Sequence, residues 1–308
     1  MNITVIGTIN KDLILPFRDL PIESFGGIFY DVSVLSRLLD PGKDRIVPVS
    51  YIGEDIATNF QAIVSKMPHV AQEGLIPIPE KNHKVILEYS TPEKRLERSL
   101  FPFPPLSWAQ IEPHVAGADM IIVNLICGWD LDFDAFTKLS DLAYDRLYLD
   151  VHYLLMGRDE LGRRIPEKPP GAAEWLNRSK FVQMNADEYA LLAAGSRNEV
   201  DFFQRHCRED QVLLLTRGRE GALAVYRREE MVAQRHFPGL RVPRIIDTTG
   251  CGDAFGAGFV VEYLQSGSLA AAAAYANRVA AAKLTLRGTT EMDKLPEAMR
   301  QVATLNPS

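Results

Sequence analysis

The residues best suited to chemistry lie close together in the segment 244–259, RIIDTTGCGDAFGAGF. Apolar residues that can end a strand lead into two glycines around a small residue, and the apolar run that follows, to about residue 265, predicts a helix. Asp253 would lie in the first turn of this helix, where the helix dipole keeps a carboxylate charged at neutral pH. The backbone N–H groups of residues 250–252 would be unpaired and could bind an anion. A charged base beside an anion site is what phosphoryl transfer to an alcohol requires.

A glycine-rich turn before a helix is common, however, and Asp253 could simply cap the helix. The longer string DTTGCGDAFxAGF is more specific, because it resembles the C-terminal signature of the ribokinase-like, or PfkB, family of sugar and nucleoside kinases. The resemblance implies that Asp253 is the base for the acceptor hydroxyl. It also implies an anion hole formed by the small residues before it: Gly250, Cys251 and Gly252. The family usually has alanine where this sequence has Cys251, which is still small enough.

Composition is that of an ordinary globular protein, with 308 residues, 46% hydrophobic and 24% charged. The net charge of −6 argues against nucleic-acid binding, and no apolar stretch reaches the length needed to span a membrane. The start of the chain lacks the features of a signal peptide. Three cysteines, far apart, show neither metal-binding spacing nor a disulfide framework, so we expect a cytoplasmic protein.

Strand and helix patterns alternate along the middle of the chain, at residues 120–125, 133–142 and 147–151, which predicts a doubly wound parallel sheet. The family resemblance implies a three-layer α/β/α ribokinase-like fold with a mostly parallel central sheet. It further implies a single kinase domain over residues 1–308, with a small β-sheet lid built from segments near 10–30 and 83–101. Residues 158–170, rich in charge and proline, are predicted to be a surface loop.

Two segments near the N-terminus resemble the parts of the family that bind the acceptor. The string GTINKDLIL, residues 7–15, matches the N-terminal signature, in which the aspartate binds sugar hydroxyls, although its polar residues could also be plain turn residues. A pair of glycines then matches the start of the family's first signature. The implied substrate-binding residues are Asn10, Asp12, Gly26, Gly27 and Asp31.

The match weakens after the glycine pair, where the family usually continues Lys-Gly-x-Asn. Asp31 takes the place of the substrate-binding asparagine, and no glutamate stands near Ile126, where the ribokinase subgroup would have one. Phe29 and Tyr30 add aromatic surface that could stack on a nucleoside base. We therefore expect an uncharged acceptor, with ribose and fructose 6-phosphate both poor.

The donor side is predicted from three further segments. Asn185 and Glu188 resemble the family's magnesium and phosphate motif, although the same spacing is an ordinary capping box. The string TRGREG, residues 216–221, resembles the ATP-phosphate segment, or it is a simple turn between strands. The implied nucleotide-binding residues are Asn185, Glu188, Thr216, Gly218, Gly221 and, against adenine, Asn277.

Two metal ions are also implied by the resemblance. Mg²⁺ would be held near Glu188, largely through water, and a monovalent cation such as K⁺ would lie near Asp247, Thr249 and Gly288. Together these features predict an ATP-dependent kinase that phosphorylates a hydroxyl of a small sugar or polyol. The alternatives are a nucleoside kinase of the same fold and a catalytically silent sugar- or nucleotide-binding regulator. A homodimer through the lid is possible in either case.

Overall fold

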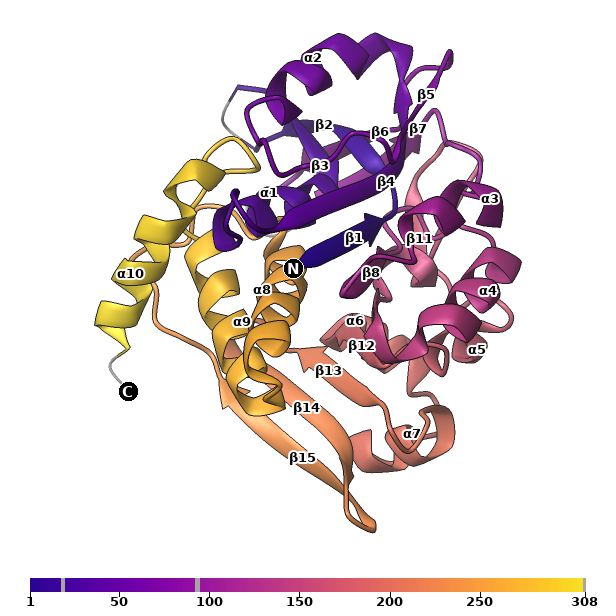
Figure 1. Ribbon diagram of the computed structural model, residues 1–308, viewed down its shortest axis with the longest axis vertical. Coiled ribbons are helices and arrows are strands. Elements are labelled where there is room, and N and C mark those ends of the chain that lie inside the picture. Colours follow the sequence, from indigo (N-terminus) through magenta and orange to yellow (C-terminus); the bar gives the residue numbers. More distant parts are fainter. Residues whose placement is uncertain (18–19, 92–94, 307–308) are drawn as a thin grey trace.

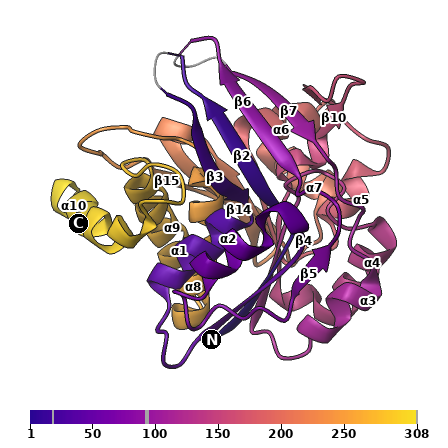
Figure 2. The same ribbon diagram turned by 90° about the horizontal axis from the view of Figure 1, so that it is seen from above.

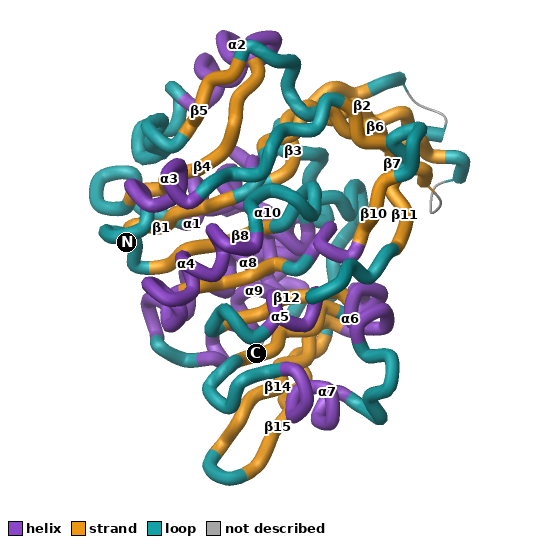
Figure 3. Tube along the Cα trace, turned by 90° about the vertical axis from the view of Figure 1, so that its right-hand side faces the viewer, coloured by secondary structure: helices purple, strands orange, loops and turns teal. Residues whose placement is uncertain are grey.

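The computed structural model describes residues 1–17, 20–91 and 95–306. Its main feature is a nine-stranded sheet that is parallel except at one edge, where β14 and β15 run antiparallel. Figure 3 shows these strands side by side. Their order is β15 (Met231–Pro238), β14 (Gly221–Arg228), β13 (Val212–Thr216), β12 (Phe181–Asn185), β9 (Leu147–Asp150), β8 (Met120–Asn124), β1 (Asn2–Ile6), β4 (Arg45–Gly53) and β5 (Leu75–Ile78).

Successive side chains of the central strands point to opposite faces of the sheet and pack into two separate cores, one on each face. In β8, for example, Ile122 packs into one core while Ile121 and Val123 pack into the other. The first core is closed by α1 (Phe29–Leu38), α2 (Glu54–Val64), α8 (Cys251–Ser266), α9 (Leu269–Lys283) and α10 (Leu295–Leu305). The second is closed by α3 (Trp108–Ile111), α4 (Phe133–Ala143), α5 (Ala172–Leu176), α6 (Ala186–Leu192) and α7 (Glu199–His206). The predicted three-layer α/β/α fold is confirmed, as the two helix layers in Figure 1 show.

A second sheet of four strands stands against the main sheet, in the place predicted for the lid. It contains β3 (Ile22–Gly27), β2 (Ile9–Leu15), β6 (Lys84–Tyr89) and β7 (Arg95–Leu100), in that order. Figure 2 shows these strands extending from the body of the molecule. Among the helices that the structure describes, none has both the length and the apolar character needed to cross a bilayer.

Residues 158–170 were predicted to be a surface loop; most of them are exposed, but the segment is not all loop. They contain part of a hairpin, β10 (Met156–Arg158) and β11 (Arg164–Pro166), whose turn is closed by an ion pair of 2.7 Å between Arg163 Nε and Asp159 Oδ2. A single bridge between Arg98 and Arg163 joins the hairpin to β7. Arg163 and Asp159 therefore pair within the hairpin, and the hairpin extends the lid (Figure 3).

Candidate active site

Four neighbouring parallel strands end in polar residues at one edge of the main sheet. Asn124 ends β8, Asp150 ends β9, Asn185 ends β12 and Thr216 ends β13. Because the strands are in register, Asn124 pairs with Asp150, and Asn185 pairs with Thr216. The carboxyl edge of an open α/β sheet is where such folds bind their ligands. The candidate site lies along this edge.

The N-terminus of α8 closes the site from the first helix layer. Gly250 precedes the helix with φ +79°, and the ring of Tyr30 occupies the space that a β-carbon would need there. Helical bonding starts early, since Ala254 N–H donates to the Gly250 carbonyl at 2.9 Å. Helix α8 thus begins at Cys251, and Asp253 lies in its first turn.

One of the three N–H groups predicted for the anion hole is already engaged. Cys251 N–H donates to the Thr248 carbonyl at 3.3 Å, which closes a turn before the helix. The N–H groups of Gly252 and Asp253, in the first turn, have no carbonyl partner within the helix. Of the three N–H groups predicted to bind an anion, that of Cys251 is therefore the one already engaged by the chain. Burial raises the pKa of the Cys251 thiol to about 12, so this side chain is neutral.

Asp253 is buried and shares a hydrogen-bond donor with a second carboxyl group. The amide nitrogen of Asn124 donates to Asp253 Oδ1 at 2.7 Å and to Asp31 Oδ2 at 2.9 Å. Burial raises the pKa of Asp253 to about 6, although the bond from Asn124 opposes this. Burial and then the charge of Asp253 raise the pKa of Asp31 well above its ordinary value. A pKa of about 6 would leave Asp253 mostly charged at pH 7, by a narrower margin than a helix terminus alone would give.

Gln183 supports the other side of the α8 terminus. Gln183 Nε2 donates to Asp150 Oδ2 at 2.5 Å and to the Gly252 carbonyl at 3.1 Å, while Tyr148 Oη donates to Gln183 Oε1 at 2.6 Å. Burial, followed by the charges of nearby carboxylates, raises the pKa of Asp150 well above its ordinary value.

A cavity of about 790 Å³ adjoins the α8 terminus, with Cys251 and Gly252 in its wall. Part of its lining is apolar and comes from Leu240, Val242 and Phe255. Five of the six predicted nucleotide-binding residues line it: Asn185, Thr216, Gly218, Gly221 and Asn277. The amide nitrogen of Asn277 is held by the Phe237 carbonyl at 3.0 Å and the Pro238 carbonyl at 3.3 Å.

Glu188 is the exception, because it lines a second cavity of about 930 Å³. Asn185 and Asp187 line both cavities, so the two spaces adjoin at the start of α6. The predicted capping box is present: Asn185 N–H donates to Glu188 Oε2 at 2.8 Å, and Glu188 N–H donates back to Asn185 Oδ1 at 2.9 Å. Burial raises the pKa of Glu188 to about 7. No group of three or more His, Cys, Asp or Glu side chains in the described ranges could hold a metal ion.

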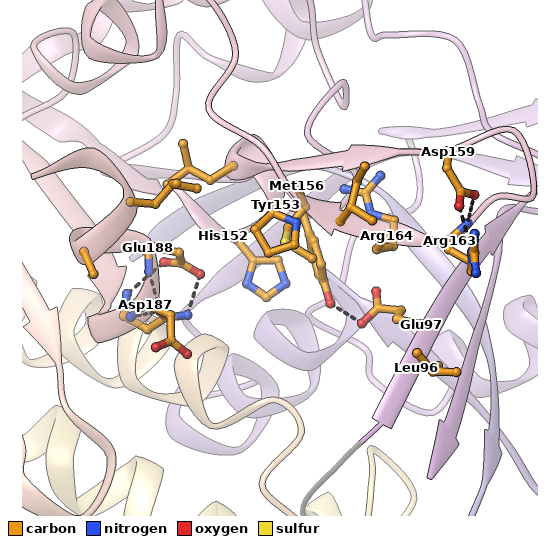
Figure 4. Close-up of a pocket in the computed structure, with 16 residues that line it drawn as sticks. Leu96, Glu97, His152, Tyr153, Met156, Asp159, Arg163, Arg164, Asp187 and Glu188 are labelled. Atoms are coloured by element: carbon orange, nitrogen blue, oxygen red, sulfur yellow. Dashed lines mark hydrogen bonds and ion pairs between the residues drawn. The ribbon is translucent and has the colours of Figure 1, made fainter. Parts of the chain in front are cut away.

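Figure 4 shows the second cavity, with Asp187 and Glu188 on one side and lid residues on the other. Tyr153 lies between them and donates its hydroxyl to Glu97. The Arg164 guanidinium donates to the Cys127 carbonyl at 2.7 Å, and it lies 4.9 Å from the Tyr153 ring centroid.

The predicted acceptor residues of the lid lie together at the start of β2 and the end of β3. Asn10 pairs with Gly26 in the ladder, and the Asp12 carboxylate fills the space beside the Gly26 α-carbon. Gly27 has φ +61°, and the Thr8 carbonyl lies where its β-carbon would be. Asn10 Oδ1 is buried without a hydrogen-bond partner among the described residues. Asp31 is buried, like Asn10 and Asp12, and it accepts a hydrogen bond from the same Asn124 amide that donates to Asp253.

The aromatic residues before Asp31 do not offer a surface to a nucleoside base. Phe29 is buried in contact with Phe25 and Phe60, with ring centroids 6.1 Å and 5.2 Å away. Tyr30 is buried against Gly250. Both side chains are buried in the core, so the prediction that they could stack on a base is wrong.

The residues predicted for a monovalent cation do lie together, but a lysine lies among them. The Asp247 carboxylate accepts the Thr249 N–H at 2.9 Å and the Gly288 N–H at 2.8 Å. Lys283 Nζ lies 3.6 Å from Asp247 Oδ2. Burial alone would raise the pKa of Asp247, but Lys283 and these N–H groups lower it.

Several site residues were missed by reasoning from the sequence. Asn124, Asp150 and Gln183 are polar residues in or at the end of otherwise apolar strands, and Lys283 ends an alanine-rich helix. A polar residue that ends a buried parallel strand is a usable signal, since such ends meet at the ligand-binding edge.

Comparison with known proteins agrees with this geometry. Residues 158–297 match the model of the pfkB family carbohydrate kinase. Deoxyribokinases from Salmonella typhi and Salmonella typhimurium are 33% identical over 123 residues, which is 40% of this chain. The match spans 37% of the length of those relatives.

Solved structures of the ribokinase family superimpose on nearly the whole chain. A nucleoside kinase from Burkholderia thailandensis in complex with inosine has a TM-score of 0.73 at 18% identity, covering 100% of this chain and 99% of the other. Ribokinase from Thermotoga maritima has a TM-score of 0.71 at 16% identity, covering 97% and 99%. A pyrophosphate-dependent kinase of the family, with a pyrophosphate analog and myo-inositol, has a TM-score of 0.75 at 14% identity, covering 96% and 99%. The structure is of the ribokinase fold. Residues 158–297 match the pfkB family model within this fold, in agreement with the resemblance seen in the sequence.

Proposed function

We propose that this protein is an ATP-dependent kinase that phosphorylates a hydroxyl group of a small sugar or polyol. One observation carries the proposal: the buried carboxylate of Asp253 lies in the first turn of α8. The two residues immediately before it, Cys251 and Gly252, form part of the wall of a large cavity. This arrangement places a base and an anion-binding helix terminus within one turn of each other.

In this proposal Asp253 orients the acceptor hydroxyl and accepts its proton. Asn124 holds the carboxylate in place at 2.7 Å, and the free N–H groups at the start of α8 offset the charge on the transferred phosphoryl group. Asn10 and Asp12 bind acceptor hydroxyls, and the unpartnered Asn10 Oδ1 supports this role. Closure of the lid over the acceptor excludes water and limits wasteful hydrolysis.

The donor cavity suits a nucleotide better than pyrophosphate. Part of its surface is apolar and comes from Leu240, Val242 and Phe255. A purine ring would cover this surface, whereas a bare pyrophosphate would leave it exposed to water. Thr216 and the glycines after it lie where phosphate groups would approach the backbone. Asn277 lies at the adenine end in this proposal.

Magnesium is expected with the nucleotide, and the carboxylates at the start of α6 fit it. Glu188 and Asp187 face the junction of the two cavities, and carboxylate oxygens are suitable ligands for metal-bound water. When bound, the ion would neutralise phosphate charge. Glu188 must be charged to hold the ion. Because its pKa is about 7, it is only partly charged at neutral pH, and a nearby cation would lower this pKa and favour the charged form.

The surroundings of the acceptor favour an uncharged molecule. The second cavity, which lies beside the lid, is lined by the carboxylates of Glu97, Asp159, Asp187 and Glu188. Of the two arginines that also line it, Arg163 is paired with Asp159 and Arg164 donates to the Cys127 carbonyl. A phosphate on the acceptor would be repelled by these charges in a closed site. The buried Ile126, in contact with Gly27, removes a polar partner.

The test is a coupled ADP-release screen over sugars, polyols and nucleosides, each with its phosphorylated form where one exists. We expect turnover with an unphosphorylated sugar or polyol, and none with pyrophosphate as donor. A clear preference for a nucleoside would support the alternative kinase, and a preference for a sugar phosphate would contradict the uncharged acceptor. Binding of nucleotide without any turnover would indicate the silent regulator, against which the intact Asp253 argues.

We further propose that the whole chain forms one kinase domain in the cytoplasm. All three cysteines are free thiols, which suits a reducing compartment. The outer strand β3 of the lid has an edge through which a homodimer could form, whereas β7 is joined to the β10–β11 hairpin. Light scattering of the intact chain and of a variant with proline at the exposed Glu23 in β3 would test the dimer.

A further inference from the structure

A fully buried lysine lies behind the N-terminus of α8. Lys283, the last residue of α9, has 0% exposure, and its Nζ donates to the Leu286 carbonyl at 3.2 Å. The same Nζ is 3.6 Å from Asp247 Oδ2 and 5.6 Å from the centroid of the Tyr30 ring. Lysine is almost never fully buried unless its charge is paired. The fold has therefore placed a positive charge inside the protein where the chain supplies partners for it.

This is the place where the sequence predicts a monovalent cation, and the residues present do not fit one. Asp247 turns its oxygens to the N–H groups of Thr249 and Gly288, and N–H groups cannot coordinate a metal ion. The Leu286 carbonyl, an oxygen that could serve as a ligand, accepts from Lys283 instead. The oxygens around Asp247 are thus already bound to donors of this chain.

We propose that the Lys283 ammonium group is a built-in cation that takes the place of an exchangeable monovalent ion. The inference rests on the proposed kinase function, in which the α8 terminus is the anion site. Lys283 fixes Asp247, three residues before Gly250, and its charge lies over Tyr30, whose ring packs on Gly250. It is a positioning residue, since it acts through these neighbours.

The charge of Lys283 also reaches the candidate base. It lowers the pKa of Asp253, against the larger effect of burial. A permanent internal cation would therefore keep the base charged without an ion from solution. The expected consequence is a kinase whose rate and stability do not depend on potassium.

The first experiment uses the unaltered protein. Turnover and the midpoint of thermal unfolding are measured in potassium chloride and in choline chloride at equal ionic strength. We expect both quantities to be the same in the two salts. A potassium-specific rise in turnover, or in the midpoint, would overturn the proposal.

The second experiment removes the charge and leaves room for an ion. Lys283→Ala should lower turnover about tenfold or more, and lower the unfolding midpoint, because Asp247 loses its buried partner. Potassium or ammonium ions should then restore turnover in a saturable way, and shift the acid limb of the pH–rate profile back. Lys294→Ala, which removes an exposed lysine paired with Glu291, is the matched control and should behave like the unaltered protein in both salts.

The outcomes separate this inference from the proposed function. If no acceptor is phosphorylated under any condition, the kinase proposal fails, whereas the unfolding midpoints in the two salts still decide whether the protein takes up an ion. If Lys283→Ala is fully active in choline chloride, the lysine has no positioning role and the inference is wrong. If that variant does not fold, the comparison of salts on the unaltered protein remains decisive.

Discussion

Replacing Asn124 tests whether the candidate base is held in its charged form by one amide group. This side chain donates to Asp253 Oδ1 at 2.7 Å and to Asp31 Oδ2 at 2.9 Å. Leucine has nearly the same shape but no donor, so Asn124→Leu removes both bonds and adds little strain. The charged form of Asp253 loses more than the neutral form, and its pKa must rise.

The size of the effect follows from the hydrogen bond that is lost. A bond to a charged group contributes about 1.5–3 kcal/mol, and about 1.4 kcal/mol corresponds to one pH unit, so the pKa should rise by roughly one to two. Starting from a pKa of about 6, Asp253 would then titrate between about 7 and 8. At pH 7 the charged fraction would fall from about nine-tenths to about a quarter, which lowers turnover roughly fourfold.

The assay is turnover at saturating substrates across pH 5–9, at constant ionic strength. In the unaltered protein turnover should rise with pH through about 6, because a base must be charged to accept a proton. In Asn124→Leu this rise should move to higher pH, with turnover recovered at pH 9. The matched control is Asp31→Asn, which removes the neighbouring carboxyl group and should leave the rise unchanged or move it to lower pH. A loss of turnover in Asn124→Leu that pH 9 does not recover would refute the reasoning.

Three further substitutions address single carboxyl groups. Asp253→Asn should lower turnover at least about a hundredfold, the scale of a lost general base, while ATP affinity measured by titration calorimetry changes little. Glu188→Gln should raise the magnesium concentration needed for half-maximal turnover without changing the KM of the acceptor; an unchanged magnesium titration would leave this residue only its capping role. Burial raises the pKa of Asp150, so its contribution to stability is present below its ordinary value of 3.8 and is lost as pH rises towards its folded value. Asp150→Asn should therefore raise the unfolding midpoint more at pH 8 than at pH 5, and an equal change at both pH values would contradict a buried neutral acid.

The fold and the outline of the site could be predicted because they depend on local patterns. Alternating apolar strands and helices specify the layered sheet, and the glycines around Cys251 specify the turn before α8. Asn185 and Glu188 are close in sequence, so their capping box could be read directly, and the structure contains it. Each of these features needs only residues a few positions apart.

Features that depend on distant residues could not be predicted in the same way. Asn124 and Asp253 are separated by 129 positions, and nothing in either segment alone indicates that one amide joins two carboxyl groups. Phe29 looked like free aromatic surface, but contact with Phe60 from another helix buries it. The hairpin containing Arg164 looked like a solvated loop, but Arg164 donates to the carbonyl of Cys127, 37 positions earlier in the chain. Burial and pairing are properties of the packed molecule, and composition does not reveal them.

The ion predicted beside Asp247 also depended on information that a sequence motif does not contain. A motif shows which residues meet, but it does not show whether their polar atoms are still available. Around Asp247 the atoms do meet, yet donors of the chain itself, Thr249, Gly288 and Lys283, take up the carboxylate. Around Asp253 the situation is the reverse, since Asn124 is shared with Asp31 and Asn124 Oδ1 has no partner among the described residues. Asp253 is thus the less completely satisfied of the two carboxylates, and under the proposed function this leaves it the capacity to accept a substrate proton.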